Sequence, residues 1–150
     1  MTRKRNRLQH YDYSQDGVYF VTLCSTNHSE IFGKVIESDQ AYVELTPLGK
    51  CINDTIELQN KNGVTIDQYV IMPNHIHLLI AFENTEHKQS LHQIVRNIKS
   101  FVTKSAGFSP WQKSFHDHVI RNERQYLKIA EYIQNNPGKW SEDCYHVNAK

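Results

Sequence analysis

The stretch from Val64 to Phe82 constrains the fold more than any other part of this chain. Two runs rich in β-branched and aliphatic residues are separated by Pro73-Asn74, a pair typical of a tight turn, so the stretch predicts two adjacent strands. Successive side chains of a strand point to opposite faces of its sheet. His75 and His77 are therefore expected on one face of the second strand, with the neighbouring aliphatic residues on the other.

These two histidines allow two interpretations. Two imidazoles held side by side by a rigid strand can bind a divalent metal ion. The alternative is an amphipathic strand that carries two surface histidines. The pair alone favours this alternative, because a metal site needs further ligands from elsewhere in the chain.

Length and composition indicate a single globular domain, residues 1–150, with a basic N-terminal arm at 1–16 and a C-terminal tail at 140–150. Of the 150 residues, 39% are hydrophobic and 22% are charged, which is ordinary for such a domain. No apolar run approaches the ~20 residues that a membrane-spanning helix needs, and no apolar segment follows the basic N-terminus to make a secretion signal. Three widely spaced cysteines argue against a disulfide framework and favour a reducing cytoplasm.

The order of the remaining patterns predicts an α+β protein. Helical and strand periodicities alternate along the chain, with capping residues, proline or glycine at the boundaries. Apart from an extra hairpin, the order is that of a ferredoxin-like antiparallel sheet (split βαβ) with helices on one face and an added C-terminal helix that can lie across the open face. The expected strands are 17–26, 31–35, 41–45, 64–72, 75–82 and 114–121, and the expected helices are 47–61, 90–106 and 123–136.

The last of these helices carries a candidate nucleophile and a candidate third ligand. Lys128, Tyr132 and Asn136 follow one another at four-residue spacing and so share one helix face. An Asn oxygen is a suitable hard ligand to complete a His-His-Asn set. A tyrosine hydroxyl beside a metal-bound phosphate is a competent nucleophile. The spacing leaves open that Tyr132 is only a half-buried packing residue.

Several stretches, in order along the chain, resemble one family. Residues 70–80, VIMPNHIHLLI, resemble the HUH motif (His, hydrophobic residue, His) of the single-tyrosine HUH transposases, which move insertion sequences as single-stranded DNA. Residues 131–137, EYIQNNP, resemble the tyrosine helix of that family, and their Asn-Pro ending is similar to the REP-associated tyrosine transposases. Residues 7–22 and 114–121 resemble the N-terminus of this group and the strand before its tyrosine helix.

The resemblance implies a metal-dependent DNA transposase. His75 and His77 would bind the catalytic ion, Mg²⁺ or Mn²⁺, and Asn136 would take the place of the third ligand. Tyr132 would attack a phosphodiester of single-stranded DNA near a hairpin, giving a 5′-phosphotyrosine and a free 3′-hydroxyl. The alternatives are a nickase of the replication-initiator or relaxase type and a non-catalytic nucleic-acid-binding ferredoxin-like module.

Basic residues are the candidate contacts to DNA. The resemblance implies single-stranded DNA with hairpin structure as the partner, and Arg and Lys side chains would contact its phosphates. A homodimer is the expected assembly, although the sequence does not decide between monomer and dimer. The candidate DNA-binding residues are Arg3, Lys4, Arg5, Arg7, Arg96, Lys99, Arg121 and Lys128.

Other residues have the right chemistry but are expected to do something else. His116 and His118 form a second pair at the same spacing, for which substrate contact or plain exposure is expected rather than metal binding. Tyr126 is a rival nucleophile, but it belongs to the apolar stripe of its helix and is expected in the core. Trp111 and Trp140 are expected to be packing anchors.

Overall fold

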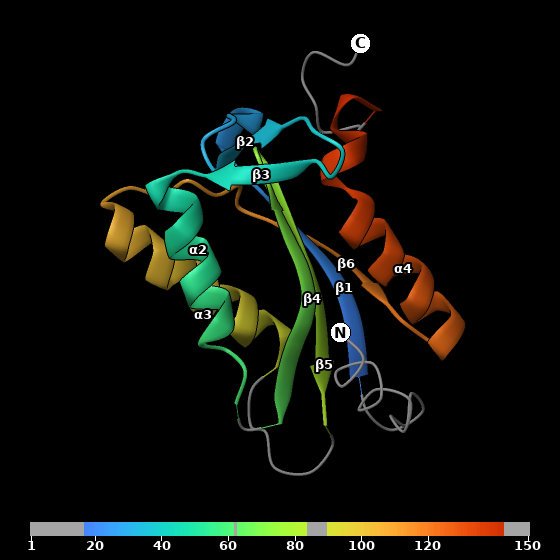
Figure 1. Cartoon of the computed structure of the whole chain (residues 1–150). Helices are drawn as coiled ribbons and strands as arrows, with labels where there is room; N and C mark the ends of the chain where they lie inside the picture. The colour runs from blue at the N-terminus through green and yellow to red at the C-terminus, as the bar shows by residue number, and fades with distance from the viewer. Residues whose placement is uncertain (1–16, 62, 84–89, 143–150) are drawn as a thin grey trace.

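The computed structural model describes residues 17–61, 63–83 and 90–142 of the chain (Figure 1). The predicted N-terminal arm and residues 143–150 of the predicted tail lie outside this part. In chain order the elements are β1 (Gly17–Cys24), η1 (Thr26–His28), β2 (Gly33–Ile36), β3 (Tyr42–Leu45), α2 (Pro47–Glu57), β4 (Val64–Met72), β5 (His75–Phe82), α3 (Leu91–Ala106), β6 (His116–Val119), α4 (Glu123–Asn135) and η2 (Pro137–Glu142).

Four strands form one antiparallel sheet in the order β4-β5-β1-β6. Strands β5 and β1 are therefore interior, and β4 and β6 form the two edges. The β2-β3 hairpin is a separate sheet that lies across one end of β4 (Figure 1). The predicted α+β class with an antiparallel sheet is confirmed.

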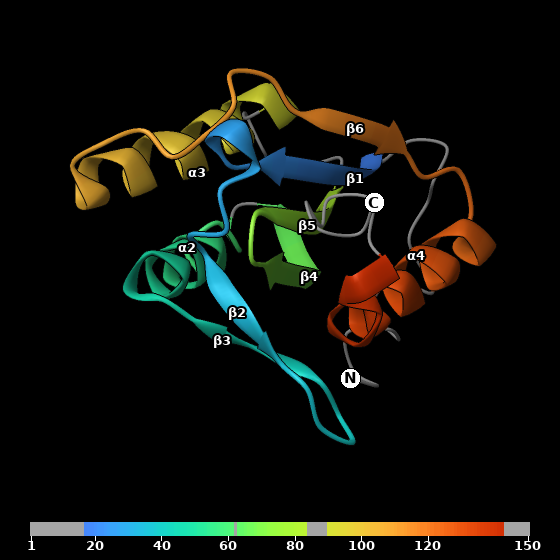
Figure 2. The same ribbon diagram turned by 90° about the horizontal axis from the view of Figure 1, so that it is seen from above.

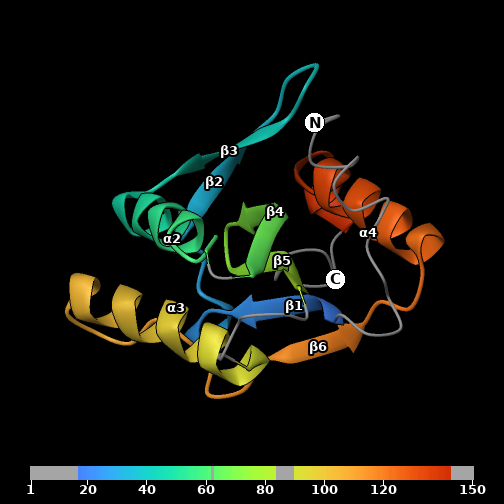
Figure 3. The ribbon, with the colours of Figure 1, turned by 90° about the horizontal axis from the view of Figure 1, so that it is seen from below.

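Helices cover both faces of the four-stranded sheet. Helices α2 and α3 lie on one face and α4 lies on the other, which is seen from above in Figure 2 and from below in Figure 3. On the first face, Ile76 and Leu78 of β5 belong to the main core. On the second face, Leu79 of β5 packs in a smaller core with Ala130 and Ile133 of α4. The added C-terminal helix thus covers the face that α2 and α3 leave open, as the element order suggested.

Local sequence determines where the helices begin and end. The Thr46 hydroxyl caps α2 by accepting a hydrogen bond from the Gly49 N–H at 3.1 Å. Ser90 and Asn122 cap α3 and α4 in the same way. Gly107 ends α3 with a φ of 84°, a left-handed conformation that glycine adopts without steric cost.

Several predicted boundaries differ from the structure. Helix α2 ends at Glu57 rather than at 61, and β1 ends at Cys24 rather than at 26, because Thr26–His28 form η1. The bounds of β2, β3, α3 and α4 differ from the expected ones by one or two residues. The strand expected at 114–121 is limited to 116–119, because as an edge strand it pairs only with residues 19–22 of β1. Residues 140–142, expected to begin a tail, belong to η2, which continues the chain after α4. Pro137 has no N–H to extend the α-helix, so a tighter helical segment follows.

No helix in the described part of the chain is long and apolar enough to cross a membrane.

Candidate metal and tyrosine site

His75 and His77 lie on the face of β5 that α4 covers. Their side chains are only 0% and 2% exposed, and their ring centroids are 4.7 Å apart. Every residue of β5 is buried, because β4 and β1 flank the strand and helices cover both faces. The two histidines share one face as predicted, and the alternative of two surface histidines is wrong.

Two neighbouring side chains orient the imidazoles. The Oδ1 atom of Asn74 lies 2.8 Å from Nδ1 of His75, and the Oγ1 atom of Thr22 lies 2.8 Å from Nδ1 of His77. These contacts engage Nδ1 of each ring, so Nε2 is the nitrogen that each ring can offer to a metal. Ligating histidines in proteins are usually held through their other nitrogen in this way.

Sequence reasoning missed both orienting residues. Thr22 stands opposite His77 in the pairing of β1 with β5. Its only sequence signal is a polar side chain within a mostly apolar strand. The sequence predicts that Asn74 lies in the turn directly before His75. It does not indicate that the Asn74 side chain contacts the His75 ring.

Asn136 comes from the C-terminal end of α4 and reaches the histidine pair. The residue is 3% exposed, and its Oδ1 atom is buried without a hydrogen bond of ordinary geometry among the described residues. Its side chain nevertheless lies close enough to His75 to influence the pKa of that imidazole. A buried amide oxygen beside His75, which itself lies beside His77, is compatible with the His-His-Asn set.

Both imidazoles are held in the neutral form that metal binding requires. Burial lowers the pKa of His75 from 6.5 to about 2, and the charge of a protonated His77 would act in the same direction. The Asn136 side chain has a smaller, opposite effect on this pKa. Burial also lowers the pKa of His77, to about 4.

Tyr132 lies beside the histidine pair within the same chain. Its side chain is 43% exposed, and its ring centroid is 5.4 Å from that of His77. The ring of Phe20 stacks on His77 at 5.1 Å and meets Tyr132 edge-on at 6.2 Å. Sequence reasoning missed Phe20, which the strand pattern marked only as a strand residue. Tyr132 is therefore both partly open to solvent and in ring contact with a buried imidazole.

Tyr126 and Trp111 lie in the two cores, whereas Trp140 lies at the histidine pair. Tyr126 is 3% exposed and belongs to the core beneath α4, as predicted. Trp111 is a packing anchor in the main core, also as predicted. Trp140 of η2 stacks on His75 with ring centroids 6.2 Å apart, a contact that the sequence did not indicate.

Arg96 and Lys99 lie on the other side of the sheet from Tyr132, on α3. Both line a groove of about 490 Å³ between α3 and the segment that leads to β6, together with Lys104 and Lys113. The Nζ atom of Lys99 donates to the carbonyl oxygen of Gln112 at 2.8 Å, and burial lowers the pKa of this amine. Two of the eight predicted basic side chains therefore line one groove, which is separate from the histidines.

The other basic candidates are dispersed. Arg121 is exposed between β6 and α4, and Lys128 is exposed on α4, where it lines a shallow recess with Glu123 and Glu131. His116 and His118 are exposed on the edge strand β6. The remaining candidates, Arg3, Lys4, Arg5 and Arg7, lie outside the described residues.

Comparisons of the sequence give two informative relatives. No protein-family model matches the chain. An uncharacterized protein of Haemophilus influenzae is 35% identical over 97% of this chain and 94% of the relative. The REP-associated tyrosine transposase of Escherichia coli K12 is 29% identical over 56% of this chain and 50% of the relative.

A comparison of folds points in the same direction. The solved structure of a REP-associated tyrosine transposase bound to a REP hairpin matches with a TM-score of 0.64 and 23% sequence identity. The match covers 85% of this chain and 74% of that one. At this identity, the similarity concerns the fold.

The buried histidines predict a loss of stability in acid. Because the pKa of His77 is 6.5 in the unfolded chain and about 4 in the folded one, the unfolded chain binds this proton first as the pH falls. Stability is therefore complete above pH 6.5 and declines toward pH 4, by on the order of 3 kcal/mol for this side chain. His75 adds to the decline and extends it toward pH 2.

Urea unfolding at several pH values, with a chelator present, measures this decline. The His77→Gln variant should show a shallower dependence on pH between 6.5 and 4. An equal slope in the variant and the wild-type chain would contradict the assignment.

Proposed function

Since the chain belongs to the family of REP-associated tyrosine transposases, we propose that it cleaves and rejoins single-stranded DNA next to hairpins. Tyr132 is the nucleophile, and His75, His77 and Asn136 hold the metal ion. The observation that carries the proposal is the contact between the rings of Tyr132 and His77, whose centroids are 5.4 Å apart in one chain. This contact places the partly exposed side chain of Tyr132, which carries the hydroxyl, against His77, one of the two buried and neutral imidazoles.

The set of donor atoms can hold a divalent ion, and the resemblance to the HUH transposases makes Mg²⁺ or Mn²⁺ the proposed one. Two imidazole nitrogens and one amide oxygen leave coordination positions for phosphate oxygens and water. An ion held by His75, His77 and Asn136 would supply polarisation of the phosphoryl group and stabilisation of negative charge on the leaving oxygen. The chain itself supplies orientation, because Asn74 and Thr22 fix the two rings through Nδ1.

Tyr132 performs the covalent step. Its phenolic oxygen loses a proton to solvent and forms a bond to phosphorus, while the bond between phosphorus and the 3′ oxygen breaks. The 3′ oxygen takes up a proton, which gives a free 3′-hydroxyl and a 5′-phosphotyrosine. Rejoining reverses the step with a second 3′-hydroxyl, and the covalent link keeps the bond energy in the meantime.

Two aromatic rings restrict the reacting groups. Phe20 contacts both His77 and Tyr132, and Trp140 stacks on His75. These contacts limit the orientations of the imidazole and phenol rings, which favours a phenolic oxygen held near the site of attack.

The proposed partner is a DNA hairpin. The similar fold that was solved with a REP hairpin bound supports this partner, and the groove along α3 supplies a place for the phosphate backbone. A location in the cytoplasm belongs to the same proposal. The expected homodimer stays a prediction, as do DNA contacts from Arg3, Lys4, Arg5, Arg7, Arg121 and Lys128.

Replacing Tyr132 by Phe should abolish the covalent adduct between protein and DNA. The change removes only the attacking oxygen, so binding of a hairpin oligonucleotide should stay within about twofold of wild type. Denaturing gel electrophoresis with a labelled oligonucleotide and Mn²⁺ detects the adduct. Tyr42→Phe is the matched control, because Tyr42 is 53% exposed on β3, which belongs to the separate two-stranded sheet. An adduct that survives in Tyr132→Phe would assign the nucleophile to another residue.

Removing the metal or its ligands should stop cleavage. Chelation with EDTA and the His77→Ala variant should both leave no adduct, and Thr22→Val should weaken Mn²⁺ binding by about 10- to 100-fold because Thr22 only orients the ring. Calorimetric titration with Mn²⁺ measures the affinities. His118→Ala is the control, since this exposed histidine is not a predicted ligand. Unchanged Mn²⁺ affinity in His77→Ala would refute the ligand assignment.

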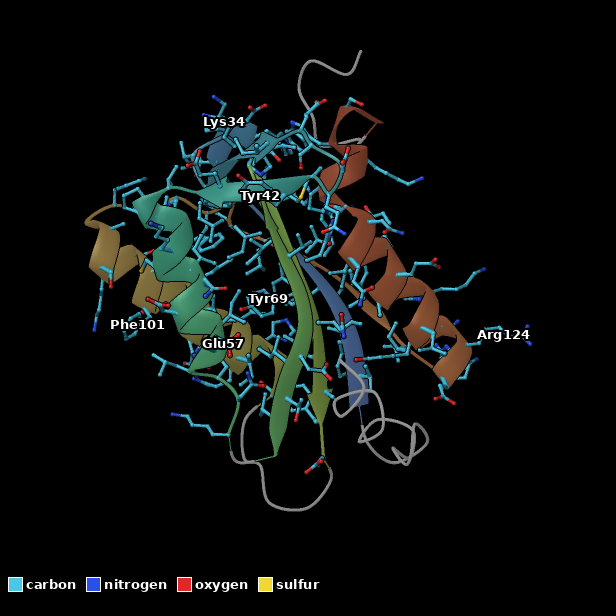
Figure 4. All side chains as sticks on the ribbon, in the orientation of Figure 1. Lys34, Tyr42, Glu57, Tyr69, Phe101 and Arg124 are labelled. Carbon is cyan, nitrogen blue, oxygen red and sulfur yellow. The ribbon has the colours of Figure 1, made fainter. Side chains whose placement is uncertain are left out.

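Charge removal in the groove should weaken hairpin binding without changing the chemical step. In the Arg96→Ala, Lys113→Ala double variant, the slope of log affinity against log salt should decrease by about one for each phosphate that the groove no longer neutralises. Fluorescence anisotropy at several salt concentrations measures this slope, and adduct formation at saturating DNA should not change. The control is Arg124→Ala, since Arg124 is exposed at the outer end of α4 (Figure 4). If the Arg96→Ala, Lys113→Ala double variant and Arg124→Ala show the same hairpin affinity and the same salt slope, the groove does not hold the hairpin.

A further inference from the structure

We propose that Asp67 and Tyr126 are positioning residues whose hydrogen bond fixes α4 along the sheet and thereby places Tyr132 against His77. The contribution to catalysis rests on the proposed function. The contribution to the position of Tyr132 does not, and it can be measured without DNA or metal.

A β-bulge presents Asp67 to α4. In the pairing of β4 with β5, Ile66 stands opposite Ile80 and Gln68 opposite Leu79, so Asp67 is the extra residue between two consecutive pairs. Bulges of this kind bend a strand and redirect a side chain. Here the redirected carboxylate accepts a hydrogen bond from α4, on the face of the sheet that carries His75 and His77.

The bond that results is directional and mostly shielded from water. The hydroxyl of Tyr126 donates to Oδ1 of Asp67 at 2.9 Å, and the Tyr126 side chain is only 3% exposed. A hydrogen bond to a carboxylate is stronger than one between neutral groups, and it tolerates little displacement.

The rest of the contact between α4 and the sheet is less specific. Ala130 and Ile133 pack on small and aliphatic residues such as Leu79, and apolar burial has no preferred direction. Of the other polar contacts, the one from Gln134 to Gln68 is long at 3.4 Å and exposed to solvent, and Oδ1 of Asn136 near His75 makes no hydrogen bond of ordinary geometry with the described residues. The apolar contacts alone would permit a shift of α4 along its axis, whereas the bond between Asp67 and Tyr126 would not.

A shift of this kind would separate the nucleophile from the metal ligands. A shift of α4 by one helical turn would move Tyr132 by about 5.4 Å along the helix axis. The ring centroids of Tyr132 and His77 are now 5.4 Å apart, so such a shift would break their contact. A displacement of about 1 Å at a reacting group can reduce a rate about 100-fold. The bond therefore defines the register in which Tyr132 is productive.

The test is ¹⁹F NMR of the full chain with 3-fluorotyrosine at position 132, whose chemical shift depends on the nearby rings of Phe20 and His77. Tyr126→Phe removes one oxygen from the core and should move this shift toward that of free fluorotyrosine. Asp67→Asn keeps an oxygen that accepts the same bond and should stay near the wild-type shift. In unlabelled chains, Tyr126→Phe should lower the rate of adduct formation at saturating DNA by about 10- to 100-fold, with unchanged affinity for the hairpin.

Tyr69→Phe is the matched control. The Tyr69 hydroxyl on β4 donates to Glu57 at 2.6 Å and also lies 2.6 Å from Oδ1 of Asn53, but on the opposite face of the sheet toward α2, beside the labelled Glu57 in Figure 4. This variant should leave the fluorine signal of Tyr132 in place.

Two results would overturn the proposal. One is an unchanged fluorine shift in Tyr126→Phe. The other is an equal change in Tyr126→Phe and Tyr69→Phe, which would indicate a general loss of stability. If wild-type protein forms no adduct but the fluorine signal moves as expected, the proposed function fails and the positioning role stands.

Discussion

The enclosure of β5 on all sides is the constraint on which the rest of the structure depends. Neighbouring strands satisfy its backbone hydrogen bonds on both edges, and helices cover both faces. A strand in this position normally carries only apolar side chains. The presence of His75 and His77 in it has an energetic cost, because imidazoles lose hydration on burial. The structure offsets part of that cost with hydrogen bonds between His77 and Thr22 and between His75 and Oδ1 of Asn74.

Because β5 is enclosed, the two faces of the sheet have different roles. The face under α2 and α3 is almost entirely apolar and provides most of the core. The face under α4 has a smaller apolar cluster at one end and the histidine pair at the other. Helix α4 therefore both closes the smaller core, through residues such as Ala130, and carries Tyr132 to the histidines. The stability of the smaller core and the proposed cleavage therefore both depend on how α4 packs on the sheet.

The sequence predicted the parts of this arrangement that local patterns encode. Both strand bounds around Pro73-Asn74, and the shared face of the two histidines, follow from turn chemistry and the alternation of strand side chains. Thr22 could not be identified in this way, because it lies 55 residues from His77 and meets it only through the register of the sheet. Asp67 was equally hidden, since a bulge breaks the alternation on which the prediction relied.

The placement of the basic groove and of Tyr132 on opposite faces has a geometric consequence for the proposed substrate. A DNA molecule that occupies both must pass around the sheet, because the groove lies along α3 and Tyr132 lies on α4 (Figure 2). Packed layers of secondary structure are about 10 Å thick. Under the proposed function, the DNA between the base of the hairpin and the cleaved bond would have to span the thickness of the protein. That thickness would then set the number of unpaired nucleotides between the two.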